Sequence, residues 1–167
     1  MTAQLETQQS EDATQVMNGQ RAIRSALETQ LEADDRVLLL GEDVADPPGG
    51  VIGTTKGLST RFGAQRVRAT PIAEQAIVGA AIGASLVGYR PVAELMFCDF
   101  LAVAADQVAN HAAKLRYMSG GHSSVPITIT TFVAGGRFGA LGNVAIAGTI
   151  AIAIERTGVG QLCRLVE

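Results

Sequence analysis

A short run of uninterrupted apolar residues, 37–40, most constrains the fold of this chain. Gly41 follows it, and the acidic pair Glu42 and Asp43 comes next. Short apolar runs of this kind are typical of strands that are buried on both faces of a parallel sheet. Before the run, residues 19–33 predict an amphipathic helix with an apolar face formed by Ile23, Ala26, Leu27 and Leu31.

Helical and strand patterns continue to alternate along the chain. Parallel strands need a crossover between them, so this alternation predicts an α/β fold, a central parallel sheet with helices on both faces. Over residues 144–154, β-branched residues alternate with small ones, which predicts a further strand with a bend or bulge at Gly148. The remaining expected elements are a short helix over 55–62, a strand over 67–69, a helix that begins at Pro71, a strand over 89–95, a helix over 99–118 and a strand that begins at Val125.

One carboxylate, Glu74, lies in the first turn of a helix that is otherwise small and apolar. Pro71 suits the first helical position, and Thr70 before it can cap the helix with its hydroxyl. Glu74 comes one position later than the acid of a capping box. It is either an ordinary first-turn acid that the helix dipole stabilises or a functional carboxylate. Gly79 in the same helix, like the later glycines, permits close approach by another group and favours the functional interpretation.

Polar or functional side chains follow three of the predicted strands. They lie in Glu42–Asp43, in the turn from Thr70 to Glu74, and in residues 96–100. The carboxyl ends of parallel strands meet at one edge of a sheet, and ligands of open α/β sheets bind at that edge. We therefore expect these three segments to line a common site.

The composition excludes several classes of protein. The chain has 167 residues and a net charge of −3, and no basic run, so we expect neither a nucleic-acid partner nor an anionic membrane surface. No apolar run is long enough to span a bilayer, and residues 1–15 lack the pattern of a signal or transit peptide. Two distant cysteines form no disulfide framework, which indicates a cytoplasmic protein. Only 17% of the residues are charged, which predicts that a partner covers some of the surface.

Five ordered blocks of sequence resemble one family, the β subunit of thiamine-diphosphate-dependent 2-oxo acid and acetoin dehydrogenases. The resemblance covers about residues 17–138 and implies a pyrimidine-binding domain of the transketolase type. Because several blocks occur in order, it is more specific than a single glycine motif. The blocks are VLLLGEDV at 37–44, TPIAE at 70–74, GYRPVAE at 88–94, DQVAN at 106–110 and AAKLRYMSGG at 112–121.

The resemblance implies roles for four residues. Glu74 matches the glutamate that activates the cofactor by a hydrogen bond to the aminopyrimidine ring, which favours the imino tautomer needed to remove a proton from the thiazolium ring. Met96 and Phe100 match residues that pack near the pyrimidine, although both residue types are also ordinary in a core. Glu42 matches an acid near the cofactor pocket, and it is equally well explained as a charge at the end of a strand.

The resemblance also implies partners. The chain contains no Gly-Asp-Gly motif for a magnesium diphosphate, so the diphosphate of thiamine diphosphate and its Mg²⁺ are expected on a partner α subunit. The other expected partners are a lipoyl-bearing acyltransferase and a small 2-oxo acid or acetoin as substrate. Ile127 aligns with a carbonyl ligand of a monovalent cation in some relatives, but we assign no metal to this chain. Alone, it is expected to bind the cofactor weakly and to be inactive.

The resemblance ends near Ala140. The family continues there with a Gln-His-Ser-Gln segment, whereas this chain continues with residues 141–144, LGNV, and has no later histidine. We therefore expect a disordered tail over 1–17, a pyrimidine-binding domain over 18–140 and a divergent tail over 141–167, with the family's C-terminal domain absent. A frameshift or truncation is our hypothesis for this ending.

Two other functions are compatible with the sequence. The chain is alternatively an inactive truncated fragment that only associates with an α subunit or with itself. A nucleotide-binding domain of the Rossmann type is less well supported, because no Gly-x-Gly-x-x-Gly turn follows the first strand.

Overall fold

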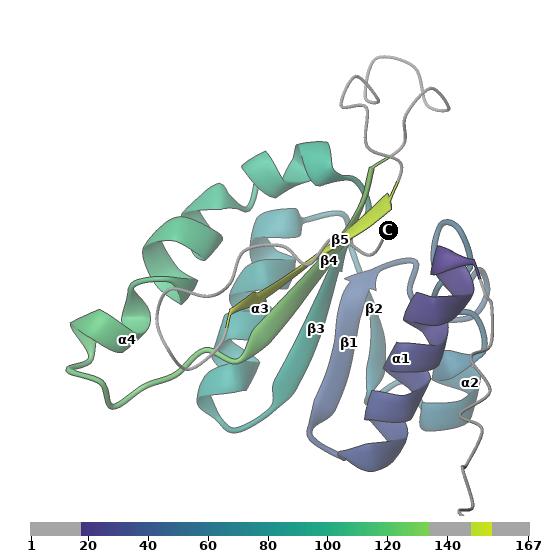
Figure 1. Ribbon diagram of the computed structural model, residues 1–167, viewed down its shortest axis with the longest axis horizontal. Helices are drawn as coiled ribbons and strands as arrows, with labels where there is room; N and C mark the ends of the chain where they lie inside the picture. The colour runs from purple at the N-terminus through teal and green to yellow at the C-terminus, as the bar shows by residue number, and fades with distance from the viewer. Residues whose placement is uncertain (1–17, 134–147, 155–167) are drawn as a thin grey trace, which may run out of the picture.

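A five-stranded sheet forms the centre of the protein (Figure 1). The structure, a computed structural model, describes residues 18–133 and the backbone of residues 148–154. Its strand order is β2-β1-β3-β4-β5, and the first four strands are parallel. The strands are β1 (Val37–Glu42), β2 (Val67–Thr70), β3 (Arg90–Leu95), β4 (Ile127–Val133) and β5 (Gly148–Ile154). The expected α/β class and parallel sheet are thus confirmed, with one addition.

The addition is the antiparallel direction of β5, which pairs with β4 at the edge of the sheet. A strand was expected over residues 144–154, and the described part of it runs over Gly148–Ile154. The expected bend or bulge at Gly148 stays a prediction, because Gly148 is the first described residue of this strand, and its ladder with β4 runs without interruption from there to Ile154. The predicted tails over 1–17 and 141–167 otherwise lie outside the described residues.

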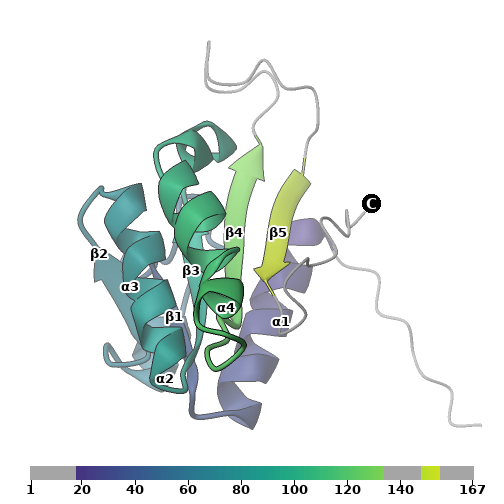
Figure 2. The ribbon, with the colours of Figure 1, turned by 90° about the vertical axis from the view of Figure 1, so that its left-hand side faces the viewer.

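Helices cover both faces of the sheet (Figure 2). On one face, α1 (Gly19–Ala33) and α2 (Leu58–Phe62) pack with the sheet around Leu31, Leu39 and Val67. On the other face, α3 (Glu74–Leu86) and the segment over residues 98–118 pack around Leu40 and neighbouring apolar side chains. Successive residues of a strand point to opposite faces, so adjacent leucines of β1 serve both cores. A strand buried on both sides explains the uninterrupted apolar run.

The helix α1 has the bounds that the sequence predicts, Gly19–Ala33. Asn18 caps it, since its side-chain oxygen accepts a hydrogen bond of 2.9 Å from the Arg21 backbone N–H. Leu27 and Leu31 are buried as expected, whereas Ala26 is exposed. Ala26 therefore does not belong to the apolar contact face.

The helix α3 begins at Glu74, not at Pro71. Thr70 is the last residue of β2, where it pairs in register with Glu42 of β1, so it is not available as a cap. The N-cap is Ala73, whose side chain makes no capping hydrogen bond. Strand pairing thus overrides the local capping signal, and the carboxylate of Glu74 belongs to the first residue of the helix.

The single helix expected over residues 99–118 is wrong. The segment consists of a 3₁₀ helix (Cys98–Ala102), a π-helix (Gln107–Ala112) and the short α4 (Leu115–Met118). Its predicted apolar stripe is nevertheless confirmed, because Ala104 and Ala112 are buried and Leu101, Val108 and Leu115 pack against the same core. Apolar residues spaced by three or four positions fit all three helix types, so the pattern predicts the buried face but not the hydrogen-bond register.

The loop between β1 and α2 is held by Asp46. Its carboxylate accepts hydrogen bonds from the Gly57 N–H (2.7 Å), the Ser59 hydroxyl (2.8 Å) and both the N–H and hydroxyl of Thr60 (3.1 and 2.9 Å). These bonds, led by the one from Gly57, lower the pKa of Asp46 to about 2. The carboxylate therefore caps the start of α2 from outside the helix.

Gly50 lies in the same loop and admits no side chain. Its φ is +81°, a region that L-residues rarely adopt. A Cβ atom there would lie 2.9 Å from the Thr54 hydroxyl oxygen and 3.0 Å from that of Thr55. Both threonines are fully buried, so neither has room to move aside.

In the part of the chain that the structure describes, no helix is long and apolar enough to cross a membrane.

Candidate active site at the carboxyl edge of the sheet

The carboxyl ends of β1 and β2 bring two acids together. Glu42 pairs in register with Thr70, so both side chains leave the sheet on the same face, the one covered by α3. The chain then turns through Pro71 into α3, and Glu74 comes close enough to Glu42 for the two carboxylates to interact electrostatically. The expectation that these two segments share one edge is confirmed.

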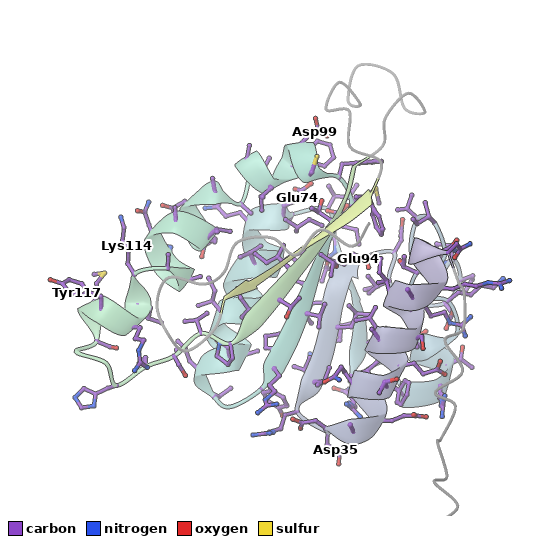
Figure 3. The ribbon with its side chains drawn as sticks, viewed as in Figure 1. Asp35, Glu74, Glu94, Asp99, Lys114 and Tyr117 are labelled. Atoms are coloured by element: carbon purple, nitrogen blue, oxygen red, sulfur yellow. The ribbon has the colours of Figure 1, made fainter. Side chains whose placement is uncertain are left out.

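Glu74 is only 6% exposed, although it is the first residue of a helix. It lines an open hollow of about 680 Å³ between α3 and the segment over residues 98–118. Figure 3 places it at the same end of the molecule as Asp99. The hollow is mostly apolar, and its lining residues are Ile72, Ala73, Glu74, Gln75, Ala76, Gly79, Ala80, Val103 and Gln107. A single acid therefore faces a shallow apolar surface.

Glu42 is buried behind this hollow rather than in it. It is 5% exposed, and it is not among the described residues that line the hollow. Burial raises the pKa of Glu42, and the nearby charges of Glu74 and Asp43 raise it further. A hydrogen bond from the Ala73 backbone N–H acts in the opposite direction. Within the described residues, its Oε1 atom has no hydrogen-bond partner.

Met96 and Phe100 follow β3 at the same edge of the sheet. Both side chains are half-buried, and neither lines the hollow beside Glu74 among the described residues. The ring of Phe100 packs edge-on against that of Phe97, with centroids 5.9 Å apart. The structure thus brings them to the correct edge, and their contact with a pyrimidine ring stays a prediction.

Val103 and Gln107 are among the residues of the hollow that were missed from the sequence. Both come from the segment that was expected to be one continuous helix. The Gln107 side-chain oxygen lies 3.4 Å from the point where a Cβ atom of Gly79 would stand, so Gly79 does permit a close approach. The Val103 side chain is 54% exposed, which shows that this side of the hollow is open to solvent in the described chain. Only the structure reveals this exposure.

Glu94 of β3 was also not singled out as a functional residue from the sequence. It is 2% exposed and lies on the opposite face of the sheet from Glu42, near Thr54 and Gly50. Burial raises the pKa of Glu94 to about 7, and the Thr54 hydroxyl opposes this rise only in part. The sequence did offer one indication of a buried acid, because Glu94 lies between apolar residues of a predicted strand.

Comparison with known proteins identifies the family of this fold. Residues 15–140 match the transketolase pyrimidine-binding domain. The chain belongs to the transketolase pyrimidine-binding domain family. The family resemblance seen in the sequence is thereby confirmed. Membership implies thiamine diphosphate as the cofactor.

Relatives of this pyrimidine-binding domain are β subunits of dehydrogenases. The β subunit of the acetoin:2,6-dichlorophenolindophenol oxidoreductase of Bacillus subtilis (strain 168) is 46% identical over 139 residues, which are 76% of this chain and 41% of that protein. The 2-oxoisovalerate dehydrogenase subunit beta of the same organism is 46% identical over 126 residues, 75% of this chain and 38% of that protein. The pyruvate dehydrogenase E1 component subunit beta of Staphylococcus epidermidis (strain ATCC 35984) is 44% identical over 116 residues, 70% of this chain and 35% of that protein. The matched part of the chain thus spans 35–41% of the length of these relatives.

The residues of this pyrimidine-binding domain fit one end of thiamine diphosphate. An aminopyrimidine ring needs an apolar surface for its faces and a carboxyl group for a ring nitrogen. The hollow offers Ile72, Ala76 and Val103 as apolar surface and the nearly buried Glu74 as the carboxyl group. Glu74 is therefore the carboxyl group that would face the ring of a cofactor bound in this hollow.

Proposed function

We propose that this chain is the pyrimidine-binding half of a thiamine-diphosphate-dependent dehydrogenase that acts on 2-oxo acids or acetoin and passes the acyl group to a lipoyl carrier. The observation that carries this proposal is the nearly buried Glu74 at the start of α3, facing the apolar hollow. The names of the relatives, all β subunits of oxidoreductases of this kind, support the reaction class.

In this proposal the residues of this chain bind and orient the pyrimidine ring of the cofactor and exclude water from it. Glu74 would hold a hydrogen bond to a ring nitrogen of the pyrimidine, and its low exposure strengthens that bond because few water molecules compete for the carboxyl group. Ile72, Ala76 and Val103 would exclude water from the ring faces. Thiamine diphosphate, when bound, supplies the nucleophilic carbon that breaks the bond next to a carbonyl group.

The rest of the catalytic site belongs to partners in this proposal. An α subunit would cover the open side of the hollow and hold the diphosphate through Mg²⁺. A lipoyl-bearing acyltransferase would accept the acyl group. Glu42, Met96 and Phe100 would complete the surroundings of the cofactor from this side. We place the assembly in the cytoplasm.

Activity of the assembled pair tests the proposal. The chain is produced together with the α subunit of a dehydrogenase of the relatives' kind, and the oxidation of 2-oxo acids and of acetoin is followed with a dye as electron acceptor. We expect activity with the wild-type chain and a loss of at least about 100-fold with Glu74→Gln, since a positioned acid contributes about that factor or more. Glu32→Gln, on the exposed side of α1, is the matched control and is expected to leave the rate unchanged.

Thermal denaturation distinguishes the alternative, an inactive fragment that only associates with other chains. Ligand binding to the folded state raises the unfolding temperature, so thiamine diphosphate with Mg²⁺ should stabilise the wild-type pair and not the Glu74→Gln pair. An unchanged unfolding temperature at saturating cofactor, in a pair that does form, would support the fragment.

A further inference from the structure

We propose that the loop over residues 46–57 is a cover of the buried Glu94 that opens locally when the Glu94 carboxyl group takes a negative charge. While Glu94 keeps its proton, the loop stays closed over it. This conformational device is a property of the folded chain, and it does not depend on the proposed function.

Glu94 lies in the sheet between two strands that offer it no positive charge. Its neighbours in register are Gly41 of β1 and Thr130 of β4. Gly41 has no side chain, and a Cβ atom there would lie only 3.0 Å from the Cβ atom of Glu94. The charged residue of β1, Glu42, points to the opposite face of the sheet, and β4 (Ile127–Val133) contains no titratable residue.

The loop closes over the carboxyl group of Glu94. A Cβ atom placed on Gly50 would lie 3.5 Å from the Glu94 Oε1 atom and 2.9 Å from the Thr54 hydroxyl oxygen. Gly50 and Thr54 are buried, whereas Val51 and Ile52 between them are 37% and 43% exposed. The loop therefore has one side on Glu94 and the other in solvent, so a single layer of chain separates this acid from water.

The charged groups of the loop and of α1 make their contacts elsewhere. Asp43 and Lys56 are exposed, and the Asp46 carboxylate is held at the start of α2. From α1, the Nη2 atom of Arg24 lies 3.4 Å from the point where a Cβ atom of Gly57 would stand, at the end of the loop. None of these contacts joins a positive charge to the buried acid.

The closed loop therefore favours a neutral Glu94. No ion pair among the residues that the structure describes includes Glu94. Its Oε2 atom and the Thr130 hydroxyl oxygen are buried without a hydrogen-bond partner in the same part of the chain. Burial raises the pKa of Glu94 to about 7. A charge at this position is stabilised only if water reaches it, and opening of the loop admits water.

Two backbone hydrogen bonds report whether the loop is closed. The Gly50 N–H donates to the Asp43 carbonyl oxygen over 2.7 Å, and the Thr55 N–H donates to that of Gly49 over 3.2 Å. Asp43 directly follows Glu42 at the carboxyl end of β1. Opening of the loop thus releases the chain directly beside the candidate site.

Opening should become easier as the pH rises. In the open loop Glu94 meets water and regains its ordinary pKa of 4.5, whereas in the closed loop its pKa is about 7. The open form therefore releases the proton first. Between these two values the equilibrium constant for opening increases by up to about tenfold per pH unit, by about 300-fold in total, and above them it levels off.

Hydrogen exchange of the Gly50 and Thr55 amides, measured by NMR on the full chain and corrected for intrinsic exchange rates, tests the proposal. From about pH 5 to about pH 8, we expect the protection of both amides to fall by about 50-fold to 100-fold in the wild type and to stay constant in Glu94→Gln. Asp35→Asn, which removes a carboxylate that is 99% exposed, is the control for the loss of a carboxylate as such. Constant protection in the wild type, or an equal fall in Glu94→Gln, would overturn the proposal.

The amide of Leu31, a buried residue of α1, distinguishes local opening from global unfolding. Local opening exposes little surface, so the two loop amides should be less protected than that of Leu31 and should respond less to low concentrations of urea. Equal protection with an equal response to urea would show that only global unfolding exposes Glu94, and would contradict the proposal. This comparison uses the wild type alone, so it holds whether or not Glu94→Gln folds.

Discussion

Replacing Glu94 by glutamine should make the stability of the folded chain less sensitive to rising pH. Glu94 lies in β3, between Gly41 of β1 and Thr130 of β4 in the sheet register. It is 2% exposed, and its Oε2 atom has no hydrogen-bond partner among the described residues. Burial dominates the ionisation of Glu94 and raises its pKa from 4.5 to about 7.

The size of the effect follows from this shift. Below the unfolded-state pKa, near 4.5, both states hold the proton and Glu94 carries no penalty. As the pH rises, the unfolded chain releases the proton first, and above about 7 the folded chain must ionise a buried carboxyl group. At about 1.4 kcal/mol per pKa unit, the free energy of unfolding should fall by about 2–3 kcal/mol between about pH 5 and about pH 8. Glu94→Gln cannot ionise and should lose this dependence.

Urea denaturation at several pH values between these limits measures the difference. The wild type should lose stability toward high pH, and Glu94→Gln should lose less by about 2–3 kcal/mol. Asp35→Asn is the control for the loss of a carboxylate as such, because the Asp35 side chain is 99% exposed. Parallel stability curves for the wild type and Glu94→Gln would refute the assignment of a buried, protonated Glu94.

Three further changes test how the fold is held together. Asp46→Asn should lower the free energy of unfolding by about 1–3 kcal/mol at neutral pH, and the difference from the wild type should shrink below about pH 4 as the wild-type carboxylate gains its proton, in urea titrations at each pH. Gly50→Ala should lower the urea midpoint more than Gly63→Ala, because a Cβ atom on Gly63 meets no atom within 4 Å and adds only the strain of a φ of +82°, about 1–2 kcal/mol. Leu31→Ala should lower the free energy of unfolding by about 2–5 kcal/mol, whereas Leu86→Ala, at a side chain 48% exposed, should change it by about 0.5 kcal/mol or less.

Much of the fold follows from periodicity and from the positions of the strands. The buried run of β1 and the helix over Gly19–Ala33 were predictable because each presents one simple pattern of burial. The meeting of Glu42 and Glu74 was also predictable, because each follows a parallel strand and such strands end at one edge. This prediction requires no knowledge of the side-chain conformations.

The features that were not predicted depend on tertiary contacts. Thr70 pairs with Glu42 in the sheet instead of capping a helix that begins at Pro71, and α3 therefore begins at Glu74. The division of residues 98–118 into three helix types leaves the apolar spacing unchanged, so the spacing does not predict this division. The burial of Glu94 depends on the loop that contains Gly50, and the sequence alone does not place that loop over the strand.

If Glu74 activates thiamine diphosphate, the proton on C2 of the thiazolium ring of the bound cofactor should exchange faster when Glu74 is present. The measurement follows the exchange of that proton for deuterium by NMR in the pair formed with the α subunit. We expect much faster exchange in the wild-type pair than in the free cofactor, and a decrease of at least about 100-fold in the Glu74→Gln pair. Equal exchange rates in the two pairs, with the cofactor bound in both, would contradict it.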